Sequence, residues 1–176
     1  MVFRPADAVE AAECWELAIA HRTGPSCLIF ARQPQAAVRQ EAPENRSARG
    51  AYVLAEAEGG PRAATILATG TEVALAMQAR AMLAAERIAV AVVSMPCWAL
   101  FEQQDRASHN AVLGTASRIG VEAAARLGCD RWIGPEGACI GMSGFRAFGA
   151  EDDLWRHSGI TAGAIAATVR RQQGLS

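Results

Sequence analysis

The stretch that decides the fold is Ala64-Thr65-Ile66-Leu67-Ala68, followed directly by Thr69-Gly70-Thr71-Glu72. An unbroken apolar run that ends in a tight turn is typical of a strand buried on both faces of a parallel sheet. Apolar residues then recur at helical spacing up to about Glu86, and Ala89–Val93 forms the next apolar run. The order strand, helix, strand predicts a right-handed βαβ unit.

The same alternation continues on both sides of this unit. We expect further strands at Tyr52–Leu54, Arg118–Glu122 and Ala138–Met142, and one or two short helices within Leu100–Leu113. A closing helix is predicted over Thr161–Gln173, with the threonine as its N-cap. Strands that alternate with helices predict an α/β fold with a mostly parallel sheet and flanking helices.

The first part of the chain has a pattern of its own. Pro5–Ile19 reads as a helix in which Asp7 accepts a hydrogen bond from the amide three residues later. Cys27–Ala31 is an apolar run, which predicts a second strand buried on both faces. Residues 33–49 contain two prolines and show little periodicity, so we place a linker and a domain boundary there.

Composition excludes several classes of protein. The 176 residues are 51% hydrophobic with a formal net charge of -1, which fits a packed α/β protein without a nucleic-acid surface. No apolar run approaches the roughly 18 residues of a membrane span. Met1–Glu10 carries charges and no apolar core of a signal peptide, so we expect a soluble, cytoplasmic protein.

The cysteine pattern predicts neither a disulfide framework nor a zinc site. The number of cysteines is odd, their spacing is irregular, and no two of them form a CxxC pair. This pattern favours reduced, mostly buried thiols over a disulfide framework or a zinc site. The five positions are Cys14, Cys27, Cys97, Cys129 and Cys139.

Several blocks of sequence, taken together, resemble the transketolases. Each block alone is weak, but they occur in the family's order and extend over nearly the whole chain. The blocks are Phe3–Asp7, Gly24-Pro25-Ser26, Gly50–Leu54, Ile66–Val73, Val92–Trp98, Val121–Ala123 and Gly159–Thr161.

This resemblance implies a place within a larger enzyme. Transketolases use thiamine diphosphate and Mg²⁺ to move a two-carbon ketol unit between sugar phosphates, at a site formed by the first two of three α/β domains across a dimer. By resemblance, residues 1–32 are the remnant of the second, pyrimidine-binding domain and residues 33–49 are the linker. Residues 50–176 then resemble the carboxy-terminal domain, a Rossmann-like three-layer fold.

The resemblance also implies what this chain does not contain. We find no GDG motif, which in the family binds the diphosphate and the metal. The family's catalytic glutamate and most of its substrate-binding histidines precede the block that contains Arg4. We therefore expect no catalytic, cofactor-binding or metal-binding residue here, and no activity from this chain alone. Its expected partners are a second copy, in a homodimer, or a companion chain that carries the first two domains.

Arg32 is the one site residue that the resemblance supplies. In the family, an arginine after this strand binds the phosphate of the sugar, and a guanidinium offers a planar fork of donors for that purpose. The alternative is a solvated arginine at a strand end. The family usually continues Arg-Gln-Asn-Leu-Pro, whereas Gln33 is followed here by Pro34-Gln35-Ala36.

Other candidates have structural alternatives. The turn Thr69–Glu72 has the spacing of a capping box, and an anion site is the other possibility. A carboxylate at Glu122, after a buried strand, suggests either a functional group of shifted pKa or a hydrogen bond to another domain or subunit. The scattered histidines, His21, His109 and His157, favour surface or packing roles over catalysis, and the four tryptophans favour core or interface positions over a binding cage.

Two further expectations concern order and identity. Residues 1–31 would lack their parent sheet, so we expect them to dock on the last domain, to pair with another copy or to be poorly ordered. Arg146 and Phe148 stand where the family has a glycine and a serine. A stand-alone binding or assembly module is the alternative to a transketolase segment.

Overall fold

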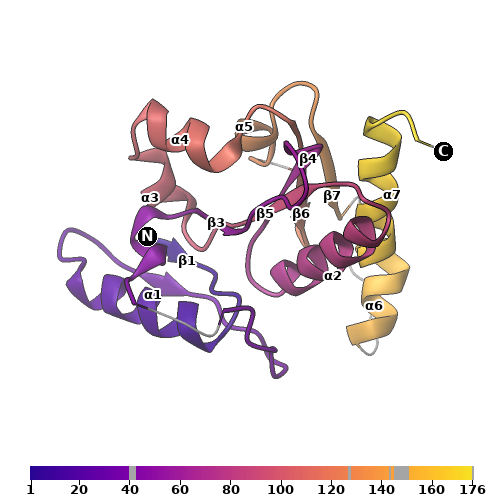
Figure 1. Cartoon of the computed structure of the whole chain (residues 1–176). Coiled ribbons are helices and arrows are strands. Elements are labelled where there is room, and N and C mark those ends of the chain that lie inside the picture. Colours follow the sequence, from indigo (N-terminus) through magenta and orange to yellow (C-terminus); the bar gives the residue numbers. More distant parts are fainter. Residues whose placement is uncertain (40–42, 127, 143, 145–150, 176) are drawn as a thin grey trace.

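A five-stranded sheet forms the centre of the molecule (Figure 1). The computed structural model describes residues 1–39, 43–126, 128–142, 144 and 151–175. The strand order is β3-β5-β4-β6-β7, in which β3 is antiparallel to β5 and the other pairs are parallel. The strands are β3 (Tyr52–Ala55), β4 (Ala64–Ala68), β5 (Val90–Ser94), β6 (Ser117–Glu122) and β7 (Ala138–Gly141).

Helices cover both faces of this sheet, which makes three layers. One face carries α2 (Glu72–Ala85) and α7 (Ala162–Gln172), whose apolar side chains share a core with Ile66, Val92 and Ile119. The opposite face carries α3 (Trp98–Glu102), α4 (Arg106–Leu113) and α5 (Asp130–Ile133), which pack on Leu67 and Val93. Because successive strand residues point to opposite faces, strands covered on both sides must be apolar throughout.

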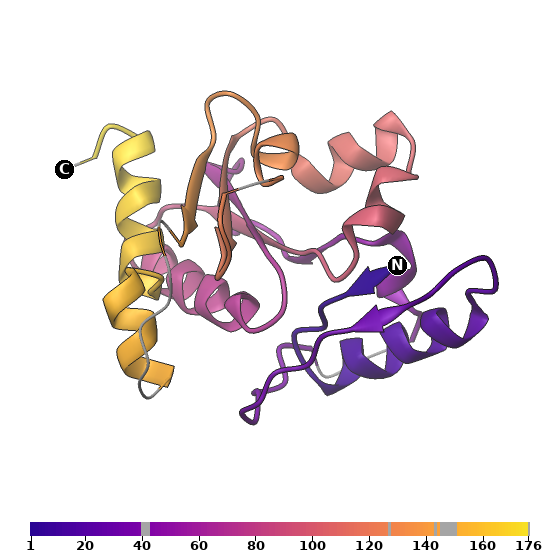
Figure 2. The same cartoon turned by 180° about the vertical axis from the view of Figure 1, so that it is seen from behind.

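A separate, smaller unit precedes this sheet. It consists of β1 (Val2–Phe3), α1 (Ala8–Ala20) and β2 (Cys27–Leu28), with β1 and β2 paired in parallel as a two-stranded sheet. A 3-10 helix, η1 (Arg46–Arg49), leads from this unit into β3. Seen from behind, the unit lies against one side of the main sheet, on the side away from α6 (Glu151–Ser158) and α7 (Figure 2). None of the helices in the described ranges is long and apolar enough to span a bilayer.

The predicted α/β fold with a mostly parallel sheet is confirmed, and most elements lie where the pattern places them. Thr161 accepts a hydrogen bond from the Ala164 amide at 3.1 Å, as predicted for an N-cap. The short helices α5 and α6 were not predicted. The expectation for Arg146 and Phe148 lies outside the described residues.

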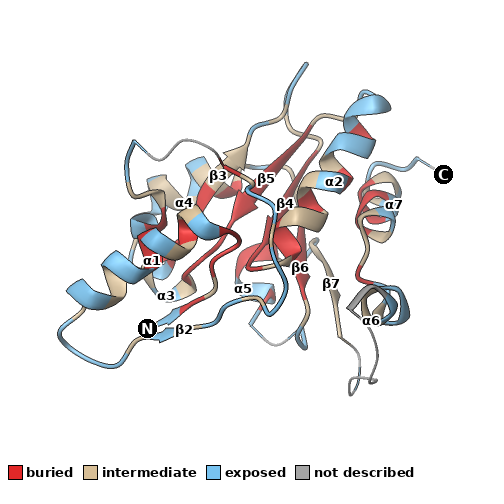
Figure 3. Cartoon of the chain, turned by 90° about the horizontal axis from the view of Figure 1, so that it is seen from below, coloured by how far each residue is buried: buried red, intermediate tan, exposed pale blue. Residues whose placement is uncertain are grey.

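One predicted strand is wrong in length and burial. Only Cys27–Leu28 of the apolar run Cys27–Ala31 is a strand, and Ile29 and Phe30 are 48% and 47% exposed. The reason is that β2 pairs with β1 alone, and no strand of the described chain lies along the other edge of β2. Figure 3 shows this contrast between the buried strands of the main sheet and the exposed β2.

Gly50 provides a test of how closely η1 and α3 pack. It ends η1 with a φ of +78°, and a Cβ on it would meet the backbone of Cys97 and Phe101. We predict that Gly50→Ala lowers the free energy of unfolding by about 4 kcal/mol, since both strain and a backbone clash result. Urea-induced unfolding measures this loss.

Gly59→Ala is the matched control for this prediction. Gly59 has a similar φ of +82°, but a Cβ there meets nothing within 4 Å. Only the cost of the left-handed backbone remains, about 1 kcal/mol. Equal losses in the two variants would contradict the close packing of η1 on α3.

Candidate functional site at the junction of the two sheets

The carboxyl edge of the main sheet is where a site is expected in this topology. Strands β5 and β6 lie on either side of β4, and the helices that follow β4 and β5 cover opposite faces of the sheet. Ligands of open α/β sheets bind in the crevice that such a reversal leaves outside the strand ends. Here Thr69 follows β4 and Glu122 ends β6, so these two residues border the crevice.

Arg4 of the amino-terminal unit occupies this crevice. Its backbone N–H donates to the Pro96 carbonyl at 2.8 Å, and its carbonyl accepts from the Gly70 amide at 3.1 Å. Its guanidinium forms an ion pair with Glu122 and lies 3.6 Å from the carboxylate of Glu72. The main chain and the side chain of one residue therefore join the small unit to the ends of three strands.

Glu72 is the acidic centre of this contact. It is 1% exposed, and its carboxylate accepts hydrogen bonds from the Ala123 amide at 2.6 Å and the Thr71 hydroxyl at 2.9 Å. The predicted capping box is wrong, because Thr71 is the N-cap residue and its side chain makes no capping bond, while the Thr69 hydroxyl donates to the Arg4 carbonyl. A buried carboxylate at the start of α2 also repels an anion, which argues against the alternative reading of this turn.

The expectation for Glu122 is resolved in the same contact. Its carboxylate pairs with Arg4, from the amino-terminal unit, as expected for a contact between separate parts of the fold. A surface cleft of about 460 Å³ remains beside this pair, lined among others by Trp98, Glu102 and Arg131. Glu102 and Arg131 are themselves paired at 2.8 Å. The charged groups of this cleft thus neutralise one another.

A second set of contacts joins α1 to the start of the main sheet. Glu10 is fully buried and accepts hydrogen bonds from the Tyr52 hydroxyl and the Ser94 hydroxyl, both at 2.6 Å, and from the Ala6 amide at 2.7 Å. Tyr52 and Ser94 are register partners on β3 and β5. One carboxylate of the small unit therefore binds two adjacent strands of the large one.

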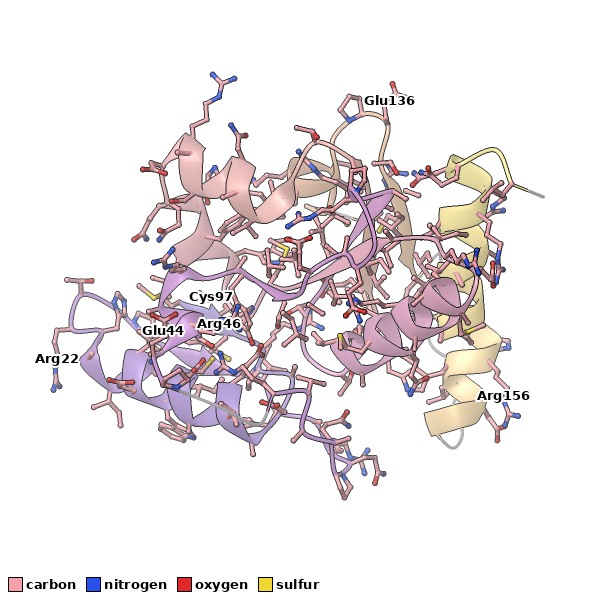
Figure 4. All side chains as sticks on the ribbon, viewed as in Figure 1. Arg22, Glu44, Arg46, Cys97, Glu136 and Arg156 are labelled. Atoms are coloured by element: carbon pink, nitrogen blue, oxygen red, sulfur yellow. The ribbon has the colours of Figure 1, made fainter. Side chains whose placement is uncertain are left out.

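Glu13, one turn further along α1, is bonded in a similar way. Its carboxylate accepts from the Ser47 hydroxyl at 2.6 Å and from the Ser47 amide at 3.1 Å, and it pairs with Arg39. The guanidinium groups of Arg39 and Arg46 lie 5.2 and 4.3 Å from the centre of the Tyr52 ring. Figure 4 shows Arg46 and Cys97 in this crowded region, whereas Arg22 projects from the far end of the unit.

Burial has a clear effect on the acidity of this cluster. Removal from water raises the pKa of Glu10 above its ordinary value, although the Ser94, Tyr52 and Ala6 donors oppose the shift. The pKa of the Tyr52 hydroxyl is raised as well, by its own burial and by the neighbouring Glu10. This environment therefore favours the protonated forms of the Glu10 carboxyl and the Tyr52 hydroxyl.

Arg32, the predicted substrate residue, lies away from both contacts. It is exposed beyond the end of β2, and within the described ranges it has no hydrogen bond or ion pair. The structure therefore leaves this residue exposed to solvent.

The other sequence candidates have structural roles. His109 packs on Phe101 and Trp132, and its ring nitrogen lies 2.6 Å from the Phe101 carbonyl, which confirms a packing role. All five cysteines are free, and three of them are buried. Trp132 is buried, whereas Trp15 is exposed and stacks on Phe30. Within the described ranges, no three His, Cys, Asp or Glu side chains are grouped to hold a metal ion.

Glu10 and Glu13 were not singled out from the sequence as contacts to the sheet. A partial signal was present, since Asp7, Glu10, Glu13 and Glu16 recur at three-residue spacing along a helix whose other residues are apolar, although Glu16 is exposed. Carboxylates on the side that carries the buried Cys14 require donors from elsewhere in the fold.

The fold and its junction define a class of protein: a three-layer α/β domain that carries a small βαβ unit across the carboxyl edge of its sheet. A profile of the Transketolase-like TK C-terminal domain matches residues 50–161. The chain belongs to this family, the carboxy-terminal domain family of transketolases.

Individual relatives agree with this assignment and show its extent. The chain is 56% identical over 168 residues to the transketolase of Sinorhizobium medicae and 46% identical over 172 residues to that of Cereibacter sphaeroides. These matches cover 94% and 97% of the chain but only 24% and 26% of the relatives. The chain thus spans about a quarter of the length of the curated relatives it matches.

Solved structures extend the similarity to the whole described fold. The transketolase of Leishmania mexicana superposes with a TM-score of 0.86 at 32% identity, over 97% of this chain and 25% of that one. The Campylobacter jejuni transketolase gives a TM-score of 0.84 at 31% identity, over 96% and 25%. The amino-terminal unit is therefore included in the likeness and is not an unrelated addition.

The buried carboxyl of Glu10 predicts a dependence of stability on pH. In the unfolded chain it ionises near 4.5, and in the folded chain only at higher pH. The folded state therefore holds this proton more tightly, so the contribution of Glu10 to stability is greatest below 4.5 and falls as pH rises through the folded pKa. Glu10→Gln, which stays neutral, should lack this fall when unfolding is followed between acidic and neutral pH.

Glu16→Gln is the control for the Glu10 variant. Glu16 is an exposed carboxylate on the same helix. Its variant should keep the pH profile of the unchanged chain. If Glu10→Gln also kept that profile, the buried carboxyl would not be the source of the pH dependence.

Proposed function

We propose that this chain is the carboxy-terminal segment of a transketolase. It completes an active enzyme together with the first two domains of that enzyme. In this proposal residues 1–32 are the end of the second domain, residues 33–49 are the linker, and residues 50–176 are the third domain. The complete enzyme transfers two-carbon ketol units between sugar phosphates. The segment holds the second-domain remnant in place and contributes no catalytic group of its own.

The observation that carries this proposal is the open apolar surface of residues 1–32. Of the large hydrophobic residues that are exposed in the described chain, five lie in this short unit. Exposed apolar residues that are concentrated in one unit of a fold are typical of an interaction surface. They are Val2, Trp15, Ile19, Ile29 and Phe30.

The backbone of the small sheet points to the same conclusion. β1 and β2 form a sheet only with each other, and the outer edge of β2 has no strand beside it in the described chain, which leaves N–H and C=O groups along that edge for a further strand to pair. The remainder of a larger parallel sheet would satisfy these groups and cover the apolar residues. The stand-alone module is not favoured, because the transketolase matches extend over 94% to 97% of the chain.

The proposed partner is either a companion chain that carries the first two domains or a second copy, in a homodimer. One solved structure of similar fold is described as a split gene transketolase in an inactive beta4 tetramer, with a TM-score of 0.79 at 23% identity. That protein shows that a transketolase can be divided between genes. A cytoplasmic location is part of the proposal and agrees with the five free cysteines.

Thiamine diphosphate and Mg²⁺ do not fit the residues described here. The helix start nearest the crevice carries the buried Glu72, already paired with Arg4 and the Ala123 amide, which would repel a diphosphate. No cluster of metal ligands occurs in the described ranges. Both groups would therefore be bound by the first two domains.

Arg32 is the residue that we propose this chain adds to the substrate site. Arg32 is exposed and lies two residues after the exposed Phe30 in the sequence, in the unit that we propose contacts the other domains. A guanidinium in that position could bind the phosphate of the sugar through two parallel hydrogen bonds.

Reconstitution tests this function. The chain is mixed with a truncated Sinorhizobium medicae transketolase that lacks the matching carboxy-terminal quarter, and ketol transfer is measured with thiamine diphosphate and Mg²⁺. We expect no turnover from this chain alone and turnover from the complex. Arg32→Ala in the complex should raise KM for sugar phosphates about 10-fold or more, since a charge-assisted hydrogen bond is lost.

Arg22→Ala is the matched control, because Arg22 is exposed in the same unit but projects from its far end (Figure 4). This variant should leave KM unchanged. Turnover by the isolated chain, or a stable complex without turnover, would overturn the proposed function. Equal KM values for Arg32→Ala and the unchanged complex would remove only the role of Arg32.

A further inference from the structure

Two cysteines meet over a glycine of β6. Cys139 on β7 is the register partner of Gly120 on β6, and neighbouring strands lie about 4.8 Å apart. The sulfur of Cys129, just before α5, lies 2.3 Å from the position that a Cβ on Gly120 would take, so any side chain there would clash with it. Because Gly120 has no side chain, the two thiols reach hydrogen-bonding contact with each other.

We propose that Cys129 and Cys139 form a reversible disulfide on exposure to a hydroperoxide, with Cys139 as the reacting thiol and Cys129 as the resolving thiol. This modification site is independent of the transketolase function proposed above. It requires only the contact between β6, β7 and α5, which lies within the described fold.

Exposure and electrostatics assign the two roles. Cys139 is partly exposed, whereas Cys129 is buried. The hydrogen bond from Cys129, helped by the nearby Arg126 and opposed by burial and Asp130, lowers the pKa of Cys139 to about 7. The same hydrogen bond and burial raise the pKa of Cys129, which therefore remains a protonated donor. Thiolates are the species that peroxides oxidise.

The other cysteines lack this combination. Cys14 and Cys97 share a buried apolar cluster, and burial raises the pKa of both thiols. Cys27 is exposed, but it lies on β2 of the other sheet. Cys14 and Cys97 therefore serve as controls for exposure, and Cys27 serves as the control for proximity to a second thiol.

The reaction balances in two steps. The Cys139 thiolate attacks one oxygen of hydrogen peroxide, the O–O bond breaks, and the departing hydroxide takes a proton to give water and a sulfenic acid. The Cys129 sulfur then attacks the sulfenic sulfur, the S–O bond breaks, and the Cys129 proton leaves with the hydroxide as a second water. Both sulfurs are oxidised, the peroxide is reduced, and a dithiol reverses the change.

Mass spectrometry of the peroxide-treated full chain tests this proposal. We expect a non-reduced digest to contain the Cys129–Cys139 linked peptide, lighter by two hydrogen atoms than the two reduced peptides together. Dithiothreitol should restore the two separate peptides. Closure of this short loop should also raise Tm by roughly 5 °C.

Single variants separate the two roles. In Cys129→Ser the sulfenic acid at Cys139 has no resolving thiol, so dimedone should label Cys139 several-fold more than in the unchanged chain. In Cys139→Ser no disulfide should form, and Cys129 should stay unlabelled. If a variant does not fold, the linked peptide of the unchanged chain still decides the proposal.

Three results would overturn the proposal. One is the absence of the linked peptide after the peroxide has oxidised Cys27, the exposed reference thiol. Another is a disulfide between other cysteines in the folded chain. The third is dimedone labelling of Cys139 in the unchanged chain as strong as in Cys129→Ser.

Discussion

A carboxylate withdrawn from water must receive hydrogen bonds or a counter-charge, and this requirement organises the molecule. Glu10 and Glu13 on α1 are buried, and their donors come from residues 39–52 and from β5. Glu72, at the start of α2, and Glu122, at the end of β6, share Arg4 of the small unit as their cation. Each side of the junction thus carries carboxylates that draw part of their hydrogen bonds or counter-charge from the other side.

Such pairs specify geometry more than they add stability, because desolvation offsets much of the Coulomb attraction. They fix where the small unit sits, and Phe3 and Cys14 of this unit also pack with Cys97 in a buried apolar cluster. The same unit carries Trp15, Ile29 and Phe30, which remain exposed. A unit that is held by buried contacts and keeps exposed apolar residues is suited to receive a further domain.

The sequence predicted the main sheet well because its strands are apolar on both faces, and this pattern has few alternatives. It failed at Cys27–Ala31, where the same apolar pattern describes a two-residue strand that pairs only with β1 in the described chain. The capping box predicted at Thr69–Glu72 was also wrong. Its spacing is present, but Glu72 pairs with Arg4 of the small unit instead of capping the helix. Tertiary partners such as Arg4 and Glu122 are far apart in sequence, so no local pattern could pair them.

The candidate site was predictable only in part. Glu122 was expected to bond across the fold, and it does, whereas Glu10 was read only as part of a helix start and also bonds Tyr52 and Ser94. Cys129 and Cys139 come together through strand register and an intervening glycine, which spacing along the chain does not reveal. The role of Arg32 in phosphate binding remains a proposal.

Native-state hydrogen exchange of the isolated chain tests the junction most directly. The amides of Ala6, Val38 and Ser47 donate to the carboxylates of Glu10, Asp7 and Glu13. If those carboxylates hold the two units together, these amides should exchange as slowly as those of β4, only through global unfolding. Rapid exchange at all three, beside a protected β4, would show that the small unit opens independently and would contradict this account.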